Sequence, residues 1–309
     1  MNSVVVEAHG LSKSFGPIGA VSGLNLTLNK GEMLCLVGPD GAGKSTAVRM
    51  LSGIIRPTSG TARVFGYDLV RENDKAKKHI GYMSQRFTLY GDLTIDENIE
   101  FFAEIHQVKG YQGRREELLA FTRLTPFRRR LAEKLSGGMK QKLALACTLV
   151  HTPDLLLLDE PTTGVDVVSR REFWTILRGL LQSGITILMT TPYMDEAERG
   201  TRVALMDRGS VAVIGTPSWV KGLMKDPVIE VICDDHRRAA AAVKDLPEVL
   251  DIQAFGDRLH LVIHSLDRGV PAVERRLTES GVKIEKWRQV SPSLENVFIS
   301  MTRAGAREP

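Results

Sequence analysis

Residues 32–46 read EMLCLVGPDGAGKST, and this stretch decides the fold of the first part of the chain. The apolar run at 32–37 is typical of a buried strand, and the segment from Lys44 to about Leu51 is expected to be a helix. The glycine-rich loop between them fits the pattern G-x-x-x-x-G-K-[ST]. Its residues are Gly38, Pro39, Asp40, Gly41, Ala42, Gly43, Lys44, Ser45 and Thr46. A strand, this loop and a helix in this order predict a phosphate-binding loop.

The residue types in the loop suit a bound nucleotide. Glycines let backbone N–H groups curl around a phosphate, and the helix N-terminus adds partial positive charge. Lys44 can reach the β and γ phosphates, and the Ser45 hydroxyl can hold Mg²⁺. Asp40 departs from this logic, because a carboxylate near phosphates is mildly repulsive, and we expect it to point to solvent.

A second buried strand, LLLLD at 155–159, ends in two acids. Apolar walls strengthen the field of a charge at a strand tip. Asp159 therefore suits a role near Mg²⁺, and Glu160 suits a catalytic base that activates water. Acids at a strand end are more often solvated than catalytic, but the upstream phosphate loop reverses that preference.

A third motif, LSGGMKQ at 135–141, lies between these two and precedes a helical segment. Alone it would indicate a capped helix start. With GPDGAGKST before it and LLLLDE after it, the chain resembles the ATP-binding subunits of ABC transporters. The resemblance covers residues 1 to about 216. It implies that ATP lies between the phosphate loop of one subunit and the signature of a second. The signature residues here are Ser136, Gly137, Gly138 and Gln141.

The resemblance assigns three further residues. Phe15 matches the aromatic residue that stacks on adenine, although by itself it would be expected in the core. Gln85 matches the glutamine that touches Mg²⁺ and the transmembrane partner. Asp166, in Gly164-Val165-Asp166, matches the loop that links the two ATP sites of a dimer. The resemblance thus implies ATP and Mg²⁺ as cofactors, with Lys44 and Glu160 as catalytic residues and with Ser45, Gln85 and Asp159 near the metal.

One family motif is missing. The family places a histidine after the strand at 185–191, typically in TTHYMDEAE, and this chain reads TTPYMDEAE at 190–198. Pro192 replaces the histidine that contacts the γ-phosphate, and proline offers neither a side-chain donor nor a backbone N–H. His151, in a loop before the second acidic strand, is no obvious substitute. We therefore expect this subunit's own site to bind ATP and to hydrolyse it slowly.

The pattern of strands and helices predicts an α/β P-loop NTPase of the ABC type. We expect a mostly parallel sheet core, an antiparallel β-subdomain, a helical subdomain at about 88–150, and a first domain that covers 1–220. A boundary rich in proline and glycine lies near 215–227. Beyond it, strands at 228–233, 249–255, 258–264 and 282–290 and helices at 236–246 and 267–281 predict a ferredoxin-like accessory domain at 226–309, with a hairpin turn at Gly256–Asp257.

Composition narrows the class of protein. The chain has 309 residues, 43% of them hydrophobic and 25% charged, and a net charge of +4. These values exclude a disordered chain and do not by themselves indicate a nucleic-acid binder. Three cysteines, Cys35, Cys147 and Cys233, lie in apolar stretches without a CxxC pair, so we expect buried thiols. No apolar run is long enough to cross a bilayer and no signal peptide is evident, so we expect a peripheral location on the cytoplasmic face of the membrane.

Within the family, the chain resembles the ATP-binding subunits of ABC-2-type drug exporters, and the tail SPSLENVFISMT at 291–302 supports that branch. The resemblance implies transmembrane permease subunits and a second ATPase subunit as partners, with a drug or other hydrophobic compound as cargo. The second ATPase can be another copy or a different chain. An importer subunit and a non-transport ABC ATPase that acts on nucleic acid are the alternatives. The nucleic-acid reading is disfavoured because the chain lacks coiled-coil insertions and tandem ATPase units, so we expect no nucleic-acid partner.

Overall fold

A computed structural model describes residues 3–86, 89–256 and 258–305. The chain divides into two compact units, Met1–Thr216 and Pro217–Pro309. We expected the first domain to extend to residue 220. In the structure, helix α8 (Pro217–Lys221) belongs instead to the second unit. Residues 1–2, 87–88 and 306–309 of the expected domains, and Asp257 of the expected turn, lie outside the described residues.

The elements of the first unit alternate between strands and helices. They are β1 (Val4–Phe15), β2 (Ile18–Asn29), β3 (Met33–Val37), α1 (Lys44–Leu51), β4 (Ser59–Val64), β5 (Tyr67–Asp68), α2 (Asn73–Lys77), β6 (Ile80–Met83), α3 (Ile95–Ile105), α4 (Tyr111–Phe121), η1 (Thr125–Phe127), η2 (Ala132–Lys134), α5 (Gly137–Leu149), β7 (Leu155–Asp159), α6 (Val167–Gln182), β8 (Thr186–Thr191), α7 (Met194–Ala197), β9 (Arg202–Asp207) and β10 (Ser210–Gly215).

A six-stranded sheet in the order β10-β9-β3-β8-β7-β6 forms the centre of this unit. All its neighbouring strands are parallel except the β9–β10 pair. Strands β3, β7 and β8 are buried along their whole length, which explains their continuous apolar sequences. Because these strands are parallel, the phosphate loop after β3 and the acids at the end of β7 meet at one edge of the sheet.

An antiparallel sheet in the order β2-β1-β4-β5 forms a second layer, and α1 packs between the two sheets. Strand β4 begins at Ser59, and sequence reasoning did not predict it. Sequence reasoning also missed β10. Both strands have few consecutive buried residues, so their sequences carry a weak hydrophobic signal. Strand β4 pairs with β1, which is distant in sequence, and β10 pairs with β9, which directly precedes it.

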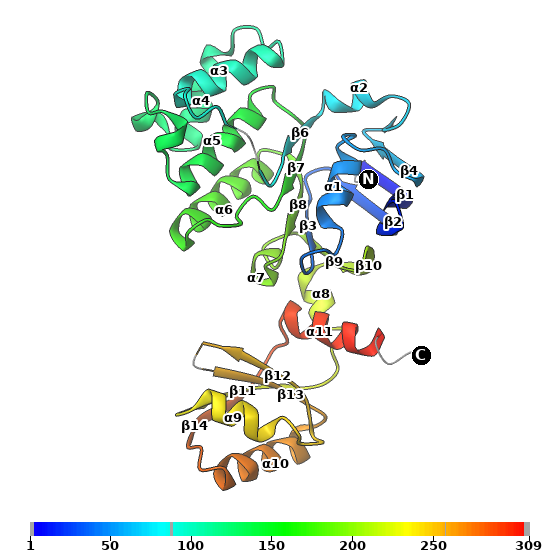
Figure 1. Ribbon diagram of the computed structural model, residues 1–309, viewed down its shortest axis with the longest axis vertical. Helices are drawn as coiled ribbons and strands as arrows, with labels where there is room; N and C mark the ends of the chain where they lie inside the picture. Colours follow the sequence, from blue (N-terminus) through cyan, green and yellow to red (C-terminus); the bar gives the residue numbers. More distant parts are fainter. Residues whose placement is uncertain (1–2, 87–88, 257, 306–309) are drawn as a thin grey trace. The chain divides into compact units, whose positions relative to one another are not determined.

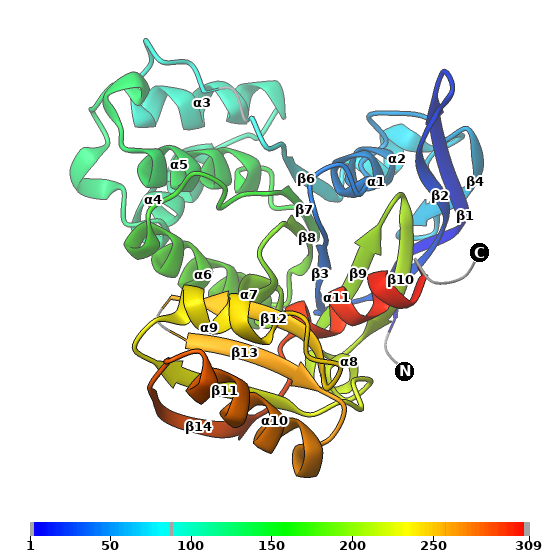
Figure 2. The ribbon, with the colours of Figure 1, turned by 60° about the horizontal axis from the view of Figure 1, so that its bottom comes forward.

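Helices α3, α4, α5 and α6 gather on the side of the central sheet away from the antiparallel sheet (Figures 1 and 2). Helix α3 begins with a capping box in which Thr94 and Glu97 exchange hydrogen bonds. Just after this cap, the fully buried Asn98 accepts from the backbone N–H of Tyr90 and donates to the carbonyl oxygens of Tyr90, Leu93 and Thr94. Asn98 therefore holds the segment that leads into α3.

The second unit contains α8, β11 (Val228–Cys233), α9 (His236–Val243), β12 (Val249–Phe255), β13 (Arg258–Ile263), α10 (Leu266–Glu279), β14 (Ile284–Val290) and α11 (Leu294–Gly305). Its strands form an antiparallel sheet in the order β12-β13-β11-β14. Helices α9 and α10 share a core with one face of this sheet. The β-α-β-β-α-β order and this strand order are those of a ferredoxin-like domain.

The three cysteines are free and buried, as expected. Burial raises the pKa of the Cys35 thiol to about 12, so Cys35 is an inert apolar residue at neutral pH. Among the described residues, no helix combines the length and the apolar character that crossing a membrane requires.

Candidate functional site

The phosphate loop has close backbone contacts at two glycines. A Cβ on Gly38 would lie 2.0 Å from the carbonyl oxygen of Met206, and a Cβ on Gly43 would lie 2.3 Å from that of Ala20. Gly43 also has a φ of +97°, which L side chains rarely adopt. These positions therefore need glycine for packing as well as for an approach to phosphate.

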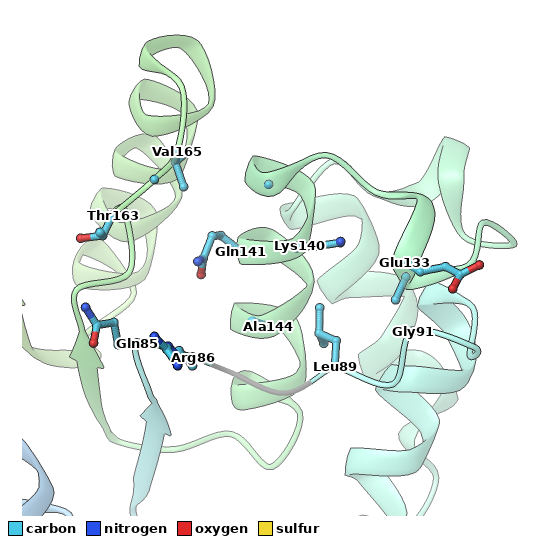
Figure 3. Close-up of a pocket in the computed structure, with 13 residues that line it drawn as sticks. Gln85, Arg86, Leu89, Gly91, Glu133, Lys140, Gln141, Ala144, Thr163 and Val165 are labelled. Atoms are coloured by element: carbon cyan, nitrogen blue, oxygen red, sulfur yellow. The ribbon is translucent and has the colours of Figure 1, made fainter.

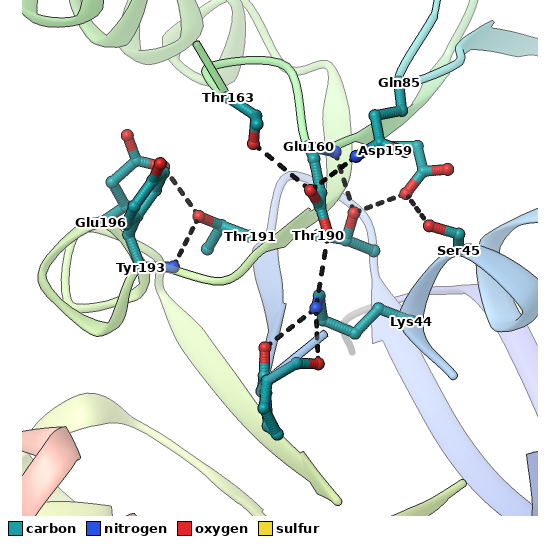
Figure 4. Close-up of polar contacts among 12 residues, drawn as sticks. Lys44, Ser45, Gln85, Asp159, Glu160, Thr163, Thr190, Thr191, Tyr193 and Glu196 are labelled. Atoms are coloured by element: carbon teal, nitrogen blue, oxygen red, sulfur yellow. Dashed lines mark hydrogen bonds and ion pairs between the residues drawn. The ribbon is translucent and has the colours of Figure 1, made fainter. Parts of the chain in front are cut away.

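Lys44 is 4% exposed, and its ammonium group contacts three oxygens. Its Nζ donates to the carbonyl oxygens of Gly38 at 2.9 Å and Pro39 at 3.0 Å. The same Nζ lies 3.3 Å from Oε1 of Glu160. A buried ammonium needs such partners, because its transfer from water is costly. Figure 4 shows this cluster at the meeting point of the phosphate loop and the end of β7.

Asp159 has one carboxylate oxygen engaged and one without a partner. Its Oδ1 accepts from the hydroxyls of Ser45 and Thr190, both at 2.8 Å. Its Oδ2 is buried and has no hydrogen-bond partner among the described residues. Carboxylate and hydroxyl oxygens are ligands that Mg²⁺ prefers. The pairing of Ser45 with a half-satisfied Asp159 therefore fits a magnesium ion.

Glu160 uses both of its carboxylate oxygens. Oε2 accepts from Gln85 Nε2 at 3.0 Å and from Thr163 Oγ1 at 3.3 Å, while Oε1 faces Lys44. The residue is 6% exposed and has a φ of +49°, a left-handed conformation that is uncommon outside glycine. Strained backbone of this kind often occurs at functional sites. In this conformation the Glu160 carboxylate contacts Lys44 and Gln85.

A cavity of about 470 Å³ unites most of the predicted nucleotide-binding residues. The predicted residues in its lining are Asp40, Gly41, Gly43, Lys44, Ser45, Thr46, Gln85, Glu160 and Pro192. Ala20, Thr163 and Tyr193 line it as well, and sequence reasoning did not name them. Thr163 directly precedes the predicted loop at Gly164 and Tyr193 directly follows Pro192, so proximity along the sequence was the available signal. Ala20 lies on β2 and carried no such signal.

A second cavity, of about 450 Å³, lies between the end of β6, the start of α5 and the 163–165 loop (Figure 3). Gln85 and Thr163 line both cavities. Gly137 and Gln141 of the predicted signature line the second one. Gly137 and Gln141 thus line a different cavity from the one that the phosphate loop lines, and Gln85 and Thr163 border both cavities.

The other signature residues lie at the start of α5. Ser136 is its exposed N-cap and accepts from the backbone N–H of Met139 at 3.3 Å. Gly138 is buried, and a Cβ there would lie 2.3 Å from the side chain of Ser169 on α6. Asp166 is the N-cap of α6 and accepts from the backbone N–H of Ser169 at 2.9 Å. This hydrogen bond lowers the pKa of the exposed Asp166 carboxyl.

Phe15 is 51% exposed at the end of β1, so the core position that an isolated phenylalanine would suggest is wrong. Lys13 Nζ lies 5.2 Å from the centre of its ring. The described lining of the nucleotide cavity does not include Phe15. An exposed ring at a strand end remains free on one side for stacking on a base, which keeps the prediction open to test.

The histidine absent at 192 is not replaced by His151. That imidazole lines a different cavity and stacks on His106, with ring centres 4.1 Å apart. Burial lowers the pKa of His151 to about 4, so it is neutral at physiological pH. Pro192 itself lines the nucleotide cavity, next to Tyr193.

The fold and the site together define a class of protein, the ATP-binding subunits of ABC transporters, and the chain belongs to this family. The ABC transporter family model matches residues 21–163. A second family model, for the C-terminal domain of DrrA1-3-like ATP-binding proteins, matches residues 215–302. The predicted fold class and family are thereby confirmed.

Three relatives show where in the family the chain lies. It is 34% identical over 309 residues to the daunorubicin resistance ATP-binding protein DrrA2 of Streptomyces coeruleorubidus, covering 98% of this chain and 96% of that one. It is 30% identical to the linearmycin resistance ATP-binding protein LnrL of Bacillus subtilis strain 168, covering 98% and 100%. It is 43% identical over 220 residues to the probable multidrug ABC transporter ATP-binding protein YbhF of Escherichia coli K12. The match covers 70% of this chain and only 38% of YbhF.

Solved structures agree with this fold. The ATP-binding cassette MJ0796, a dimer bound to ADP and Pi in a post-hydrolysis state, matches with a TM-score of 0.62 and 27% identity. That match covers 68% of this chain and 98% of MJ0796. An ATP-binding subunit of another ABC transporter matches with a TM-score of 0.64 and 26% identity, covering 71% and 92%.

Proposed function

We propose that this chain is the ATP-binding and ATP-hydrolysing subunit that powers export of a drug or other hydrophobic compound through a separate transmembrane permease. The observation that carries the proposal is the convergence of Lys44, Ser45, Glu160 and Gln85 on one cavity of about 470 Å³, with the buried Asp159 hydrogen-bonded to Ser45 beside it. Near-full-length relatives named for resistance to daunorubicin and linearmycin support the export direction over import or nucleic-acid work.

The residues divide the work of ATP hydrolysis between them. Lys44 and the backbone N–H groups of the loop hold the phosphates, and Glu160 accepts a proton from the attacking water. Because Glu160 Oε1 faces Lys44 in the structure, phosphates that attract Lys44 also free this oxygen for water. Ser45, Asp159 and Gln85 would hold Mg²⁺, which neutralises charge on the phosphates when bound. Phe15 would stack on the adenine.

The partners follow from the arrangement of the motifs. Gly137 and Gln141 line the second cavity rather than the nucleotide cavity, which supports a role for Ser136, Gly137 and Gln141 at the ATP site of a second ATPase subunit. Asp166 directly follows Val165, which lines that second cavity, and its loop would meet the same subunit. Gln85, which contacts Glu160, is the residue through which a permease at the cytoplasmic face of the membrane would sense the site.

The test compares two variants of the full chain. Lys44→Ala should weaken ATP binding about tenfold or more, because hydrogen bonds to a charged group contribute roughly 1.5–3 kcal/mol. Glu160→Gln should keep ATP binding and lower hydrolysis by about 10²–10⁴-fold, the usual effect of removing a general base. Isothermal titration with MgATP and phosphate release measure the two effects. Unchanged ATP affinity in the first variant, or unchanged turnover in the second, would refute these assignments.

A further inference from the structure

Glu196 is a buried carboxylate beside the nucleotide cavity that none of the roles above uses. It is 1% exposed and lies on α7, four positions after Pro192. Its Oε2 accepts from the hydroxyl of Thr162 at 2.8 Å and from the hydroxyl of Thr191 at 2.9 Å. Two hydroxyls from distant segments therefore meet on one oxygen (Figure 4 shows the Thr191 contact).

The two threonines each adjoin residues that line the nucleotide cavity. Thr162 precedes Thr163, which donates to the catalytic base Glu160. Thr191 ends β8 and precedes Pro192, and its hydroxyl also accepts from the backbone N–H of Tyr193 at 3.1 Å. A displacement of Glu196 would consequently move two walls of the cavity together.

Arg170 contacts both Glu196 and Tyr193 and so completes a closed ring of contacts that includes Thr191. Its Nε lies 3.4 Å from Oε1 of Glu196, and this oxygen has no hydrogen-bond partner among the described residues. Its guanidinium carbon lies 4.6 Å from the centre of the Tyr193 ring, a cation–π contact. Arg170 is in the first turn of α6, whose N-cap is Asp166. The ring thus connects the Pro192 segment to the loop that would meet a second ATPase subunit.

We propose that Glu196 is a positioning residue that holds the 162–166 loop and the 191–193 segment as one body. Pro192 has no hydrogen-bond donor, so this segment cannot be held by a contact of its own residue 192 with the γ-phosphate. Its placement depends instead on Thr191 and Tyr193, and both contacts converge on Glu196 and Arg170. This role rests on the proposed function, because it concerns hydrolysis at the nucleotide cavity.

The test removes one hydroxyl at a time in the full chain. Thr162→Val and Thr191→Val keep side-chain shape and leave Glu196 and Arg170 in place. Thr175→Val is the matched control, because Thr175 donates to a backbone carbonyl on the exposed side of α6. For each variant we would measure the dissociation constant of MgATP, the melting temperature and the rate at which excess protein hydrolyses radiolabelled ATP in a single turnover. Single turnover makes a slow rate measurable.

A positioning role predicts a split between binding and rate. Each valine variant should hydrolyse ATP about tenfold more slowly or worse, since small misplacements of reacting groups have effects of that size, while ATP affinity stays within about twofold. The double variant should lose little more than either single one, because both hydroxyls act through one carboxylate. Thr175→Val should match the wild type in rate.

Three outcomes would overturn the role. Valine variants with wild-type rates would show that the contacts do not position the site. Rates that fall only in proportion to ATP affinity or to the folded fraction would show a purely structural carboxylate. Wild-type protein that binds ATP but does not hydrolyse it would overturn the positioning role, because there would be no reaction for Glu196 to support. Wild-type protein that fails to bind ATP would refute the proposed function itself.

Discussion

At the scale of single residues, Pro192 stands where the resemblance to ABC ATPases led us to expect a histidine. It lines the nucleotide cavity beside Tyr193, where a histidine could donate to the γ-phosphate. Without that donor, the site keeps Lys44, Ser45 and Glu160 and should bind ATP. A partner ATPase with its histidine intact would then supply most of the turnover, with Ser136–Gly138 of this chain completing that partner's site.

Pro192→His should therefore raise the rate of ATP hydrolysis by the purified chain. One preorganised donor at a developing charge contributes on the order of 10²–10³ in rate. Steady-state phosphate release measures the gain, and the ATP dissociation constant should stay nearly constant. A wild-type chain that already turns over at about 1 s⁻¹ or faster, with no gain from the histidine, would contradict the slow-site proposal.

At the scale of elements, the approach of α5 to α6 depends on Gly138. A Cβ there would lie 2.3 Å from Ser169, whereas a Cβ on the adjacent Gly137 would lie 3.9 Å from its nearest neighbour, the carbonyl oxygen of Gly164. The signature sequence thus contains one glycine that packing requires and one that packing does not require. We expect that the small size of Gly137 serves contact with a nucleotide held by a second ATPase subunit.

Gly138→Ala should lower the free energy of unfolding by about 1–3 kcal/mol, the usual cost of inserting a methyl group into a packed contact. Gly137→Ala should leave stability unchanged or slightly raised, because alanine favours a helix more than glycine does. Urea denaturation of both variants measures the difference. Equal stabilities would show that α5 and α6 can separate without cost at this point.

In the second unit, Glu230 ties three strands together. It is 5% exposed on β11, and its carboxylate lies 2.7 Å from Arg288 on β14 and 3.3 Å from Arg258 on β13. The hydrogen bond from Arg288, with further contacts to Arg258 and His260, lowers the pKa of Glu230 to about 2. Folding therefore favours the ionised form of this carboxyl.

Because folding lowers the pKa of Glu230, its ionised carboxyl stabilises the fold at pH values above the unfolded pKa of about 4.3. This contribution is lost as the pH falls toward the folded pKa of about 2. Glu230→Gln should thus be less stable than the wild type at pH 6, and the gap should narrow at pH 3. Hydrogen exchange of the β11 amides measures it. Glu279→Gln, at the end of α10, is the control. A gap that does not change with pH would contradict the prediction.

At the scale of the whole molecule, the described lining of the nucleotide cavity lies within one of the two compact units. The residues that line the nucleotide cavity belong to Met1–Thr216. The second unit has a separate core on the sheet of β11–β14. Because α8 groups with the second unit, a cut after Thr216 removes that unit whole.

A chain that ends at Thr216 should fold and bind MgATP with a dissociation constant within about threefold of the full chain, a difference under about 0.7 kcal/mol. Circular dichroism checks the fold, and titration with MgATP checks the binding. A truncated chain that is folded but unable to bind ATP would show that the second unit contributes to the nucleotide site.

The sequence by itself determined the local parts of this protein. Lys44, Ser45, Asp159 and Glu160 could be named because a phosphate loop and an acidic strand end have short, contiguous signatures. The buried strands β3, β7 and β8 and the order of elements in the second unit were visible for the same reason, since hydrophobic periodicity is a local property. Strand β10 was not predicted, because its residues are at most partly buried and only its pairing with β9 identifies it as a strand.

Only the tertiary structure decided which side chains share a contact across the chain. Thr190 binds the same oxygen of Asp159 as Ser45 does, and Thr162 and Thr191 meet on Glu196. These contacts form because the parallel strands β3, β7 and β8 bring the segments that follow them to one edge of the sheet. The tertiary structure also leaves the Phe15 side chain exposed to solvent, although a local pattern would place it in the core. Such contacts depend on the register and order of distant strands, and a single sequence does not encode these in any local pattern.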